Sequence, residues 1–495
     1  MLIQAPPRNS TQNESLELDT INDRISDGLL SSPILDTPPI SPSSWFRRVE
    51  DSPIFQKVFR YPSPASLKIR PTSWLDGLRG VAAFEVYVFH AFSCWIHITS
   101  AWLSDGNSTY IFQFPFIRTF FASGGAAVSL FFSISGYVLT QKCLRFIRDA
   151  SPHQVYPSVK SSMFRRGFRL YLPPIIVTFA EMIATRFGFA PPLNFTFVPE
   201  PTSWGQFLDW ASQTNRWMNP IMHIFHGIFR HEYEAVVWTI PFEFYGSFVC
   251  YFLLLALAKV PQNRVRMGSI AIFAILSMGI GYWSLFCFAT GMLIADFHLS
   301  QEAQETSLPP NKTPSSTPTH QRLWWLLFLV AFYIAGLPAL WDNEAYSRPK
   351  PGFETLLNLT PPGFSLSTQA GSRFWWSLSG TVLMLSISQL APLKRFFETP
   401  FCQYLGKISF SLYLIHQFSL VLFGLAIRAF LRGLFGVDDL SGEGPAFWIS
   451  FMTWFVLFTG MLFVVAGQVE RWVDAPTVRF SKWLEGRVFG FLQQK

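Results

Sequence analysis

Charged side chains are scarce in this sequence, because Asp, Glu, Lys and Arg make up only 14% of its 495 residues, against roughly 25% in ordinary soluble domains. Apolar residues make up 50% and aromatic residues 17%. They are gathered in long runs that match the length a helix needs to cross about 30 Å of hydrocarbon. The composition therefore excludes an ordinary soluble enzyme and predicts an all-α polytopic membrane protein.

Cysteine is also rare, and its five residues show no CxxC spacing: Cys94, Cys143, Cys250, Cys287 and Cys402. At least three of them fall inside apolar runs, where Cys behaves as a small hydrophobic residue. We therefore expect neither a disulfide framework nor a metal site. The net charge of +7 does not indicate a nucleic-acid partner, because the Lys and Arg residues flank apolar runs instead of forming a basic domain.

The N-terminus lacks the apolar segment that a cleavable signal peptide needs. Residues 1–73 are rich in Ser, Pro, Asn and Asp, and we expect them to form a disordered cytosolic tail. The first membrane helix must then serve as the targeting signal. The sequence shows no internal repeat of the kind that builds a transporter from two similar halves.

About ten membrane helices are predicted, the fifth and sixth being short and nearly continuous. They cover residues 80–98, 121–140, 170–189, 235–258, 267–281, 283–298, 322–341, 374–393, 404–428 and 446–468. Residues 217–229 are apolar but short and contain a proline, which favours an interfacial or re-entrant segment. Residues 299–321 are predicted to be a cytosolic Ser/Pro/Thr-rich linker, and residues 476–495 a cytosolic C-terminal tail.

The distribution of basic residues predicts the orientation, since cytosolic loops carry an excess of Lys and Arg. Residues 42–79 and 141–169 hold seven each, whereas residues 99–120 hold only Arg118. Both termini are therefore predicted to be cytosolic. The glycosylation sequons that begin at Asn107, Asn194 and Asn358 all fall on the opposite, luminal side.

Ionisable side chains inside the predicted spans are few, and each needs a partner or a function. Asp76, Arg79, His90 and His97 form a stripe along the first span, and His90 lies about 16 Å deeper than Arg79. A neutral imidazole is well suited to take a proton from an alcohol, so His90 is the candidate general base. The alternative is a histidine that only bonds a neighbouring helix. Glu85 lies about 140° from His90. It is interpreted either as a protonated or Arg-paired structural carboxyl or as a functional group, since acids inside membranes are usually functional.

One pair of arginines and one cluster of small residues lie near the predicted cytosolic side. Arg166 and Arg169 are spaced i, i+3 and would form a fork for phosphate oxygens, although anchoring by positive charge explains them equally well. Small residues around Phe131 to Tyr137 favour simple helix packing.

The later spans carry two polar groups. Pro241 leaves backbone carbonyls of its helix without hydrogen bonds, which membranes tolerate mainly where a helix lines a cavity. Trp238 precedes Pro241 in the sequence, and Glu243 is expected to face that cavity. Ser409, Tyr413 and His416 share one helix face at i, i+4, i+7, which favours a shared interior site over interhelical hydrogen bonding alone.

Taken in order, these residues resemble the acyltransferase-3 family of integral membrane acyltransferases over about residues 74–475. The match runs through Trp74 to Gly80 with His90 following, the Phe-Phe-x-x-Ser-Gly-Tyr string at Tyr137, Arg166-x-x-Arg169, Trp238-Thr239 with Glu243, and Ser409 to His416. The resemblance implies helices around a central pore or cavity, an acyl-CoA co-substrate on the cytosolic side, no bound cofactor, and an O-linked acceptor.

The resemblance also assigns roles. It implies a catalytic His90 and donor-binding Arg79, Arg166 and Arg169, and carries over Glu243 and His416 as further catalytic residues. We add Asp76 to the donor group, and we expect Tyr137, Trp238, Ser409 and Tyr413 to contact the acceptor or line the cavity. The sequence departs from the family at Glu85, where an apolar residue is expected, and in lacking an appended soluble acyl-accepting domain.

The leading hypothesis is a fungal membrane O-acyltransferase in the endoplasmic reticulum or plasma membrane that transfers an acyl group, most often acetyl, to a small hydroxylated metabolite. A surface glycan is the second acceptor considered. Buried Glu and His also build proton relays, so a proton-coupled transporter is the competing class, and a receptor without chemistry is the third. Direct transfer and an acyl-histidine intermediate fit the residues equally, and the oligomeric state is left open.

Overall fold

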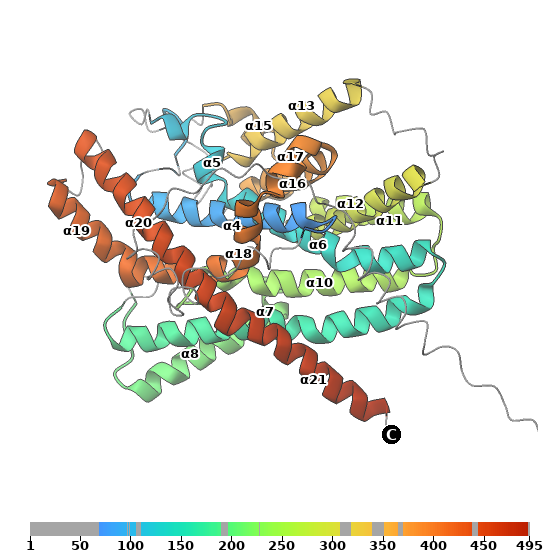
Figure 1. Cartoon of the computed structure of the whole chain (residues 1–495), viewed down its shortest axis with the longest axis horizontal. Coiled ribbons are helices and arrows are strands. Elements are labelled where there is room, and N and C mark those ends of the chain that lie inside the picture. Colours follow the sequence, from blue (N-terminus) through green and yellow to red (C-terminus); the bar gives the residue numbers. More distant parts are fainter. Residues whose placement is uncertain are drawn as a thin grey trace, which may run out of the picture. The chain divides into compact units, whose positions relative to one another are not determined.

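The computed structural model describes residues 69–96, 98, 100–104, 110–189, 197–226, 228–306, 318–338, 351–364, 370–437 and 444–493. Every regular element in these ranges is a helix (Figure 1). The predicted disordered tail at residues 1–73 lies almost entirely outside them, and the first described helix begins at Ser73.

The α-helices follow one another along the chain as α4 (Ser73–Ser93), α5 (Thr119–Ala122), α6 (Gly124–Arg148), α7 (Val155–Arg186), α8 (Ser203–Met218), α9 (Pro220–His226), α10 (Thr239–Ala256), α11 (Asn263–Gly279), α12 (Trp283–Thr306), α13 (Pro318–Ala335), α15 (Glu354–Asn358), α16 (Ala370–Gln389), α17 (Ala391–Phe397), α18 (Pro400–Ser419), α19 (Leu425–Phe435), α20 (Pro445–Val469) and α21 (Ala475–Gln493). Short 3₁₀ helices cover Ile111–Gln113, Pro152–Gln154, Ala235–Trp238 and Pro362–Phe364, and π-helical turns cover Leu420–Gly424 and Glu470–Asp474.

Each of the ten predicted spans overlaps one of these helices. In the described part of the chain, six helical segments are long and apolar enough to cross a membrane: Gly124–Arg148, Pro152–Arg186, Ala235–Ala256, Trp283–Thr306, Pro400–Phe435 and Pro445–Phe489. The other predicted spans form shorter or more polar helices; α11, for example, has 17 residues, and α4 carries Asp76, Arg79 and Glu85. The number of about ten crossings and the central pore stay predictions.

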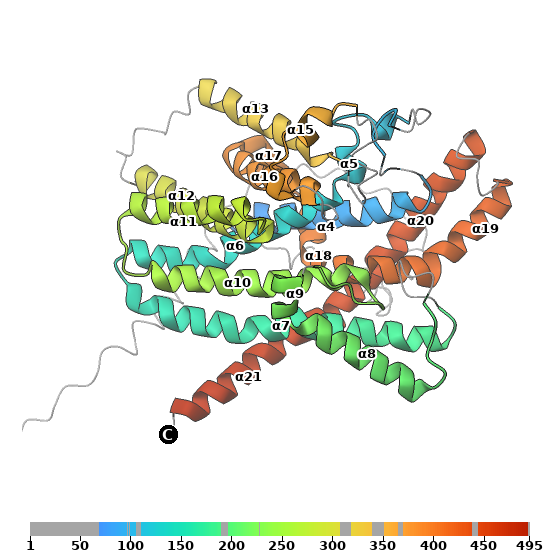
Figure 2. The ribbon, with the colours of Figure 1, turned by 180° about the vertical axis from the view of Figure 1, so that it is seen from behind.

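Helix α6 is central to the packing, since it lies against α4, α10, α12 and α16 (Figure 2). Small residues allow these close contacts. A Cβ atom on Gly136 would lie 2.1 Å from the backbone oxygen of Phe288 in α12, and one on Gly291 would lie 2.0 Å from the backbone oxygen of Ser133. The small residues that the sequence analysis attributed to helix packing therefore do bring helix backbones together.

Helices α4 and α18 touch backbone to backbone. A Cβ atom on Gly80 would lie 2.2 Å from the backbone nitrogen of Gly406, and one on Gly406 would lie 2.4 Å from the backbone oxygen of Asp76. Because only glycine has no Cβ, this pair fixes how α4 and α18 sit against each other. That contact sets the positions of every polar side chain on the facing sides of the two helices.

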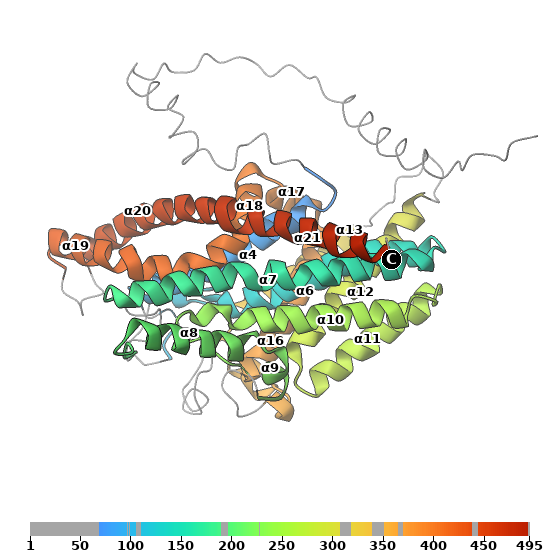
Figure 3. The same cartoon turned by 90° about the horizontal axis from the view of Figure 1, so that it is seen from below.

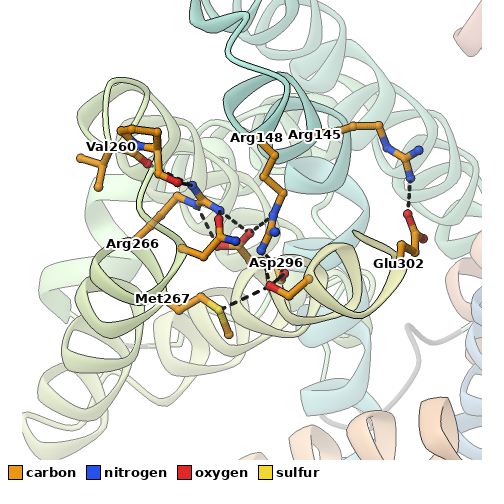
Figure 4. A network of polar contacts seen from close by, with 10 residues as sticks. Arg145, Arg148, Val260, Arg266, Met267, Asp296 and Glu302 are labelled. Atoms are coloured by element: carbon orange, nitrogen blue, oxygen red, sulfur yellow. Dashed lines mark hydrogen bonds and ion pairs between the residues drawn. The ribbon is translucent and has the colours of Figure 1, made fainter. Parts of the chain in front are cut away.

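A buried ionic network ties the end of α6 and the start of α11 to the middle of α12 (Figure 4). Asp296 of α12 is paired with Arg148 of α6 at 2.8 Å and with Arg266 of α11 at 2.7 Å. The Asp296 and Arg266 side chains have no exposed surface. Two guanidinium groups on one carboxylate satisfy the buried charge and hold α6, α11 and α12 together at this point.

The segment predicted as the C-terminal tail is helical up to Gln493, because α20 continues through a π-turn into α21. Helix α21 lies along α7 (Figure 3), where Arg165 pairs with Glu485 at 3.2 Å and Lys160 lies 4.0 Å from the ring centre of Phe489. The start of the predicted linker is also helical, since α12 runs to Thr306; residues 307–317 lie outside the described ranges.

Candidate active site

Two adjoining cavities share a cationic wall. The outer cavity has a volume of about 670 Å³ and the middle cavity about 320 Å³. Both are lined by the same four arginines, Arg79, Arg165, Arg166 and Arg169. Three of these arginines were predicted from the sequence as donor-binding residues, and the fourth comes from the same turn of α7. Four guanidinium groups around one space form an environment that favours phosphate oxygens.

Arg79 is held by the glycine contact between α4 and α18. Its Nη2 donates to the backbone oxygen of Gly406 at 2.9 Å, and its Nε donates to Oγ of Ser409 at 3.0 Å. Asp76 lies one turn earlier, with a carboxylate oxygen 3.4 Å from Nη2. Asp76 and Ser409 therefore orient Arg79, whose side chain keeps 42% of its surface exposed.

Arg166 and Glu243, predicted separately as donor and catalytic residues, are partners. Arg166 Nη2 lies 2.5 Å from the Glu243 carboxylate, and its Nε donates to Oγ of Ser247 at 2.7 Å. The hydroxyl of Ser135 also donates to this carboxylate. The pair lines the middle cavity, together with Arg169 and Asp474.

His90 lies on a third, inner cavity of about 120 Å³. The amide nitrogen of Gln417 is 3.0 Å from its Nδ1 and 3.1 Å from its Nε2. A neutral imidazole has one ring nitrogen without a proton, so the amide N–H can donate to one of the two nitrogens, and the contact holds the ring in place. The ring of His416 is centred 5.1 Å from that of His90, and its Nδ1 lies 2.7 Å from the backbone oxygen of Tyr413.

The middle and inner cavities meet at Val128 and Tyr413, which line both. The Tyr413 hydroxyl donates to the backbone oxygen of Val236 at 2.8 Å and lies 3.0 Å from Oγ1 of Thr239. Trp238, the remaining predicted cavity residue in this region, lines the inner cavity. The predicted stripe on α4 thus runs from the arginine-lined cavities at Arg79 to the inner cavity at His90.

Some predicted site residues lie elsewhere. Tyr137 lines none of the three cavities described here; it is buried on α6, with its hydroxyl 3.0 Å from Nδ1 of His298. Glu85 accepts a hydrogen bond from the backbone N–H of Ser123 at 3.3 Å, just before α6, and so caps a helix start. Among the predicted glycosylation sites, Asn358 is exposed at the end of α15. His97, Asn107 and Asn194 lie outside the described residues.

Several charged or polar residues of the cavities were not anticipated from the sequence. They include Gln417, Arg373 and Arg230 on the inner cavity and Asp474 and Lys407 on the middle cavity. Gln417 follows directly after His416, so the polar end of α18 was the one available signal. In the part of the chain that the structure describes, no group of three or more His, Cys, Asp or Glu residues is arranged to hold a metal ion.

Comparison with known proteins identifies the family of the chain. A family model described as an acyltransferase domain matches residues 72–467. The O-acetyltransferase PaAT-1 of Phomopsis amygdali is 31% identical over 457 residues, which cover 88% of each chain. Two proteins named as acyltransferases, from a Phoma species and from Cochliobolus lunatus, are each 25% identical over 82% of this chain and 94% of their own. No solved structure matches the chain. The chain belongs to the acyltransferase-3 family of membrane acyltransferases.

Proposed function

We propose that the protein transfers an acetyl group from acetyl-CoA to a hydroxyl group of a small metabolite, with His90 as the general base. One observation carries this proposal: the cavity that holds His90 adjoins the arginine-lined cavities through Val128 and Tyr413. The donor's phosphates and the reacting hydroxyl then have separate places in one connected interior.

The donor phosphates bind in the outer cavity, at Arg79, Arg165 and Arg169. Arg79 and Arg169 also line the middle cavity, so the pantetheine arm extends from the phosphates toward Tyr413 and the thioester arrives beside His90. Arg166 contributes charge here, but its main contact is Glu243 at 2.5 Å. Glu243 thus serves to hold Arg166 in place rather than to move a proton.

At the inner cavity, His90 accepts the proton of the acceptor hydroxyl as the new C–O bond forms. The C–S bond of the thioester breaks, and the leaving thiolate takes the proton back from His90. An acyl-histidine intermediate uses the same residues in two steps. His416 lies behind His90 with ring centres 5.1 Å apart, so it acts on the reaction through His90.

Acetyl is favoured as the acyl group because the relative PaAT-1 is named as an O-acetyltransferase. The three relatives named above come from fungi, which supports a specialised metabolite as the acceptor. We place the arginine-lined cavity and both termini on the cytosolic side, where acyl-CoA is available, in the endoplasmic reticulum or plasma membrane.

The test uses purified protein in lipid nanodiscs with acetyl-CoA and a metabolite extract from cells that lack the protein. Wild-type protein should release CoA only when the extract is present. One component of the extract should gain about 42 Da, the mass that an acetyl group adds. His90→Ala should abolish both signals. His298→Gln is the matched control, because His298 is a second half-buried histidine that lines none of the three cavities. Normal CoA release by His90→Ala would refute the mechanism, and flux of a substrate without CoA release would favour a transporter.

A further inference from the structure

The inner cavity carries positive charge of its own. Two of its fifteen lining residues are arginines, Arg373 from α16 and Arg230 from the segment before the 3₁₀ helix Ala235–Trp238. None of the fifteen is Asp or Glu. Two guanidinium groups that face one small space, with His90 on the same wall, form a site suited to an anion.

Arg373 is fixed in an aromatic cage. Its guanidinium carbon lies 4.7 Å from the ring centre of Trp238, 4.8 Å from that of Trp283 and 5.4 Å from that of Trp376. The residue is only 7% exposed. Three indole rings at these distances hold the guanidinium in place by cation–π contact. The cage therefore positions a donor fork of the kind that matches a carboxylate.

Arg230 is the second arginine of the inner cavity. Arg230 and its neighbour Ile228 are both exposed and both line the cavity, so the inner cavity reaches the surface at this segment. A molecule that enters at the exposed Arg230 comes into a space that Arg373 and His90 also line. A charged recognition site and the reacting group therefore share one cavity.

We propose that the acceptor is a hydroxylated acid, whose carboxylate is bound by Arg373 and Arg230 while its hydroxyl group reaches His90. This proposal rests on the proposed acyl transfer and adds the chemical class of the acceptor. The carboxylate takes no part in the reaction: the ester bond forms at the hydroxyl oxygen, and the carboxylate orients the molecule so that the correct hydroxyl lies at His90.

The experiment isolates the metabolite that accumulates in cells without the protein. In cells with the protein, this metabolite should gain about 42 Da, the mass that an acetyl group adds. The accumulated species should be retained by an anion exchanger at pH 7. Wild-type protein is then assayed with this species and with its methyl ester. Arg373→Gln should raise the KM for the acid at least tenfold and leave the KM for the ester within twofold, as expected when a charged hydrogen-bond pair is lost.

Two further variants make the result specific. Arg428→Gln is the matched control, because the Arg428 guanidinium lies 5.3 Å from the ring centre of Trp95 and is absent from the inner cavity; it should leave both KM values unchanged. Arg230→Gln changes an exposed position and is the second variant in case Arg373→Gln fails to fold. It should raise the KM for the acid in the same way, but by a smaller factor. A neutral accumulated species, or equal KM changes for acid and ester, would overturn the proposal while acyl transfer stands. If no species gains an acyl group, the proposed function fails and this inference fails with it.

Discussion

The side-chain amide of Gln417 lies within 3.1 Å of both ring nitrogens of His90, across the contact between α18 and α4. The two residues are 327 positions apart in the chain. Gln417 is 2% exposed and lines the same cavity as His90. The amide therefore fixes the orientation of the ring on which the proposed reaction depends.

Replacing Gln417 by Met keeps the side-chain length but removes the donor to His90. Because His90 then loses its fixed orientation, kcat should fall about tenfold, which corresponds to about 1.4 kcal/mol, whereas the KM for the donor should change less than twofold. Steady-state kinetics with varied acetyl-CoA measures the two effects separately. Ser419→Ala, a buried change on the same helix, is the control, and an unchanged kcat in Gln417→Met would refute the positioning role.

Arg166→Met should destabilise the protein through Glu243. The carboxylate loses its 2.5 Å partner at a site where only 14% of the side chain is exposed. An uncompensated charge of this kind costs about 2–3 kcal/mol, so the thermal unfolding midpoint in detergent should fall. Adding Glu243→Gln should restore most of the midpoint but not the donor affinity. If the double variant is as unstable as Arg166→Met, the loss of stability does not come from the unpaired Glu243 carboxylate.

Gly80→Ala should separate α4 from α18, because the new Cβ would lie 2.2 Å from the backbone nitrogen of Gly406. Both Arg79 and His90 would move relative to their partners on α18. We expect loss of activity together with a lower thermal midpoint. Gly460→Ala is the matched control in α20, where a Cβ would meet no atom within 4 Å. This substitution should stabilise its helix by about 0.5–1 kcal/mol, and equal loss in both variants would contradict the role of the contact.

The Asp296 network gives a comparison between a buried and an exposed ion pair (Figure 4). Asp296→Ala leaves two guanidinium groups without their carboxylate and should cost about 3–5 kcal/mol of stability. Glu302→Ala removes a pair with Arg145 in which both side chains are more than half exposed, and such a change should stay below about 1 kcal/mol. Thermal unfolding of the two variants measures the difference. Similar midpoints would mean that burial does not determine the strength of these pairs.

His231 should make stability depend on pH. It lies between α9 and α10, is 1% exposed, and burial lowers its pKa to about 3. In the unfolded chain the His231 ring takes up a proton at about pH 6.5, whereas in the folded chain it does so only near pH 3. The free energy of unfolding should therefore fall as the pH drops below about 6.5. At pH 5 the loss is about 2 kcal/mol. His231→Gln should flatten this pH dependence of the unfolding midpoint, and an unchanged slope would contradict it.

The sequence predicted the features that depend on spacing along one helix. The register that places His90 about three turns beyond Arg79 follows from helical periodicity alone, and α4 bears it out. The i, i+3 spacing of Arg166 and Arg169 likewise placed both on the same cavities. Each of these predictions needed only one element, which is why a single sequence contains them.

Contacts between helices were not predictable in the same way. Arg166 and Glu243 were assigned to different roles because nothing in their spacing shows that α7 and α10 bring them within 2.5 Å. Tyr137 was expected in the cavity, but the rotation of α6 against α12 directs its hydroxyl to His298. Gln417 and Arg373 were missed for the same reason, since their importance comes from partners on other helices.

The anchoring of Tyr413 has a consequence for acyl chain length. Its hydroxyl is bonded to the backbone of Val236 and lies 3.0 Å from Thr239, so the ring cannot rotate away without breaking hydrogen bonds inside the protein. The ring lines both the middle and the inner cavity. Under the proposed function, we therefore expect this one tyrosine to determine which length of thioester reaches His90, whereas the arginines determine the affinity for the coenzyme.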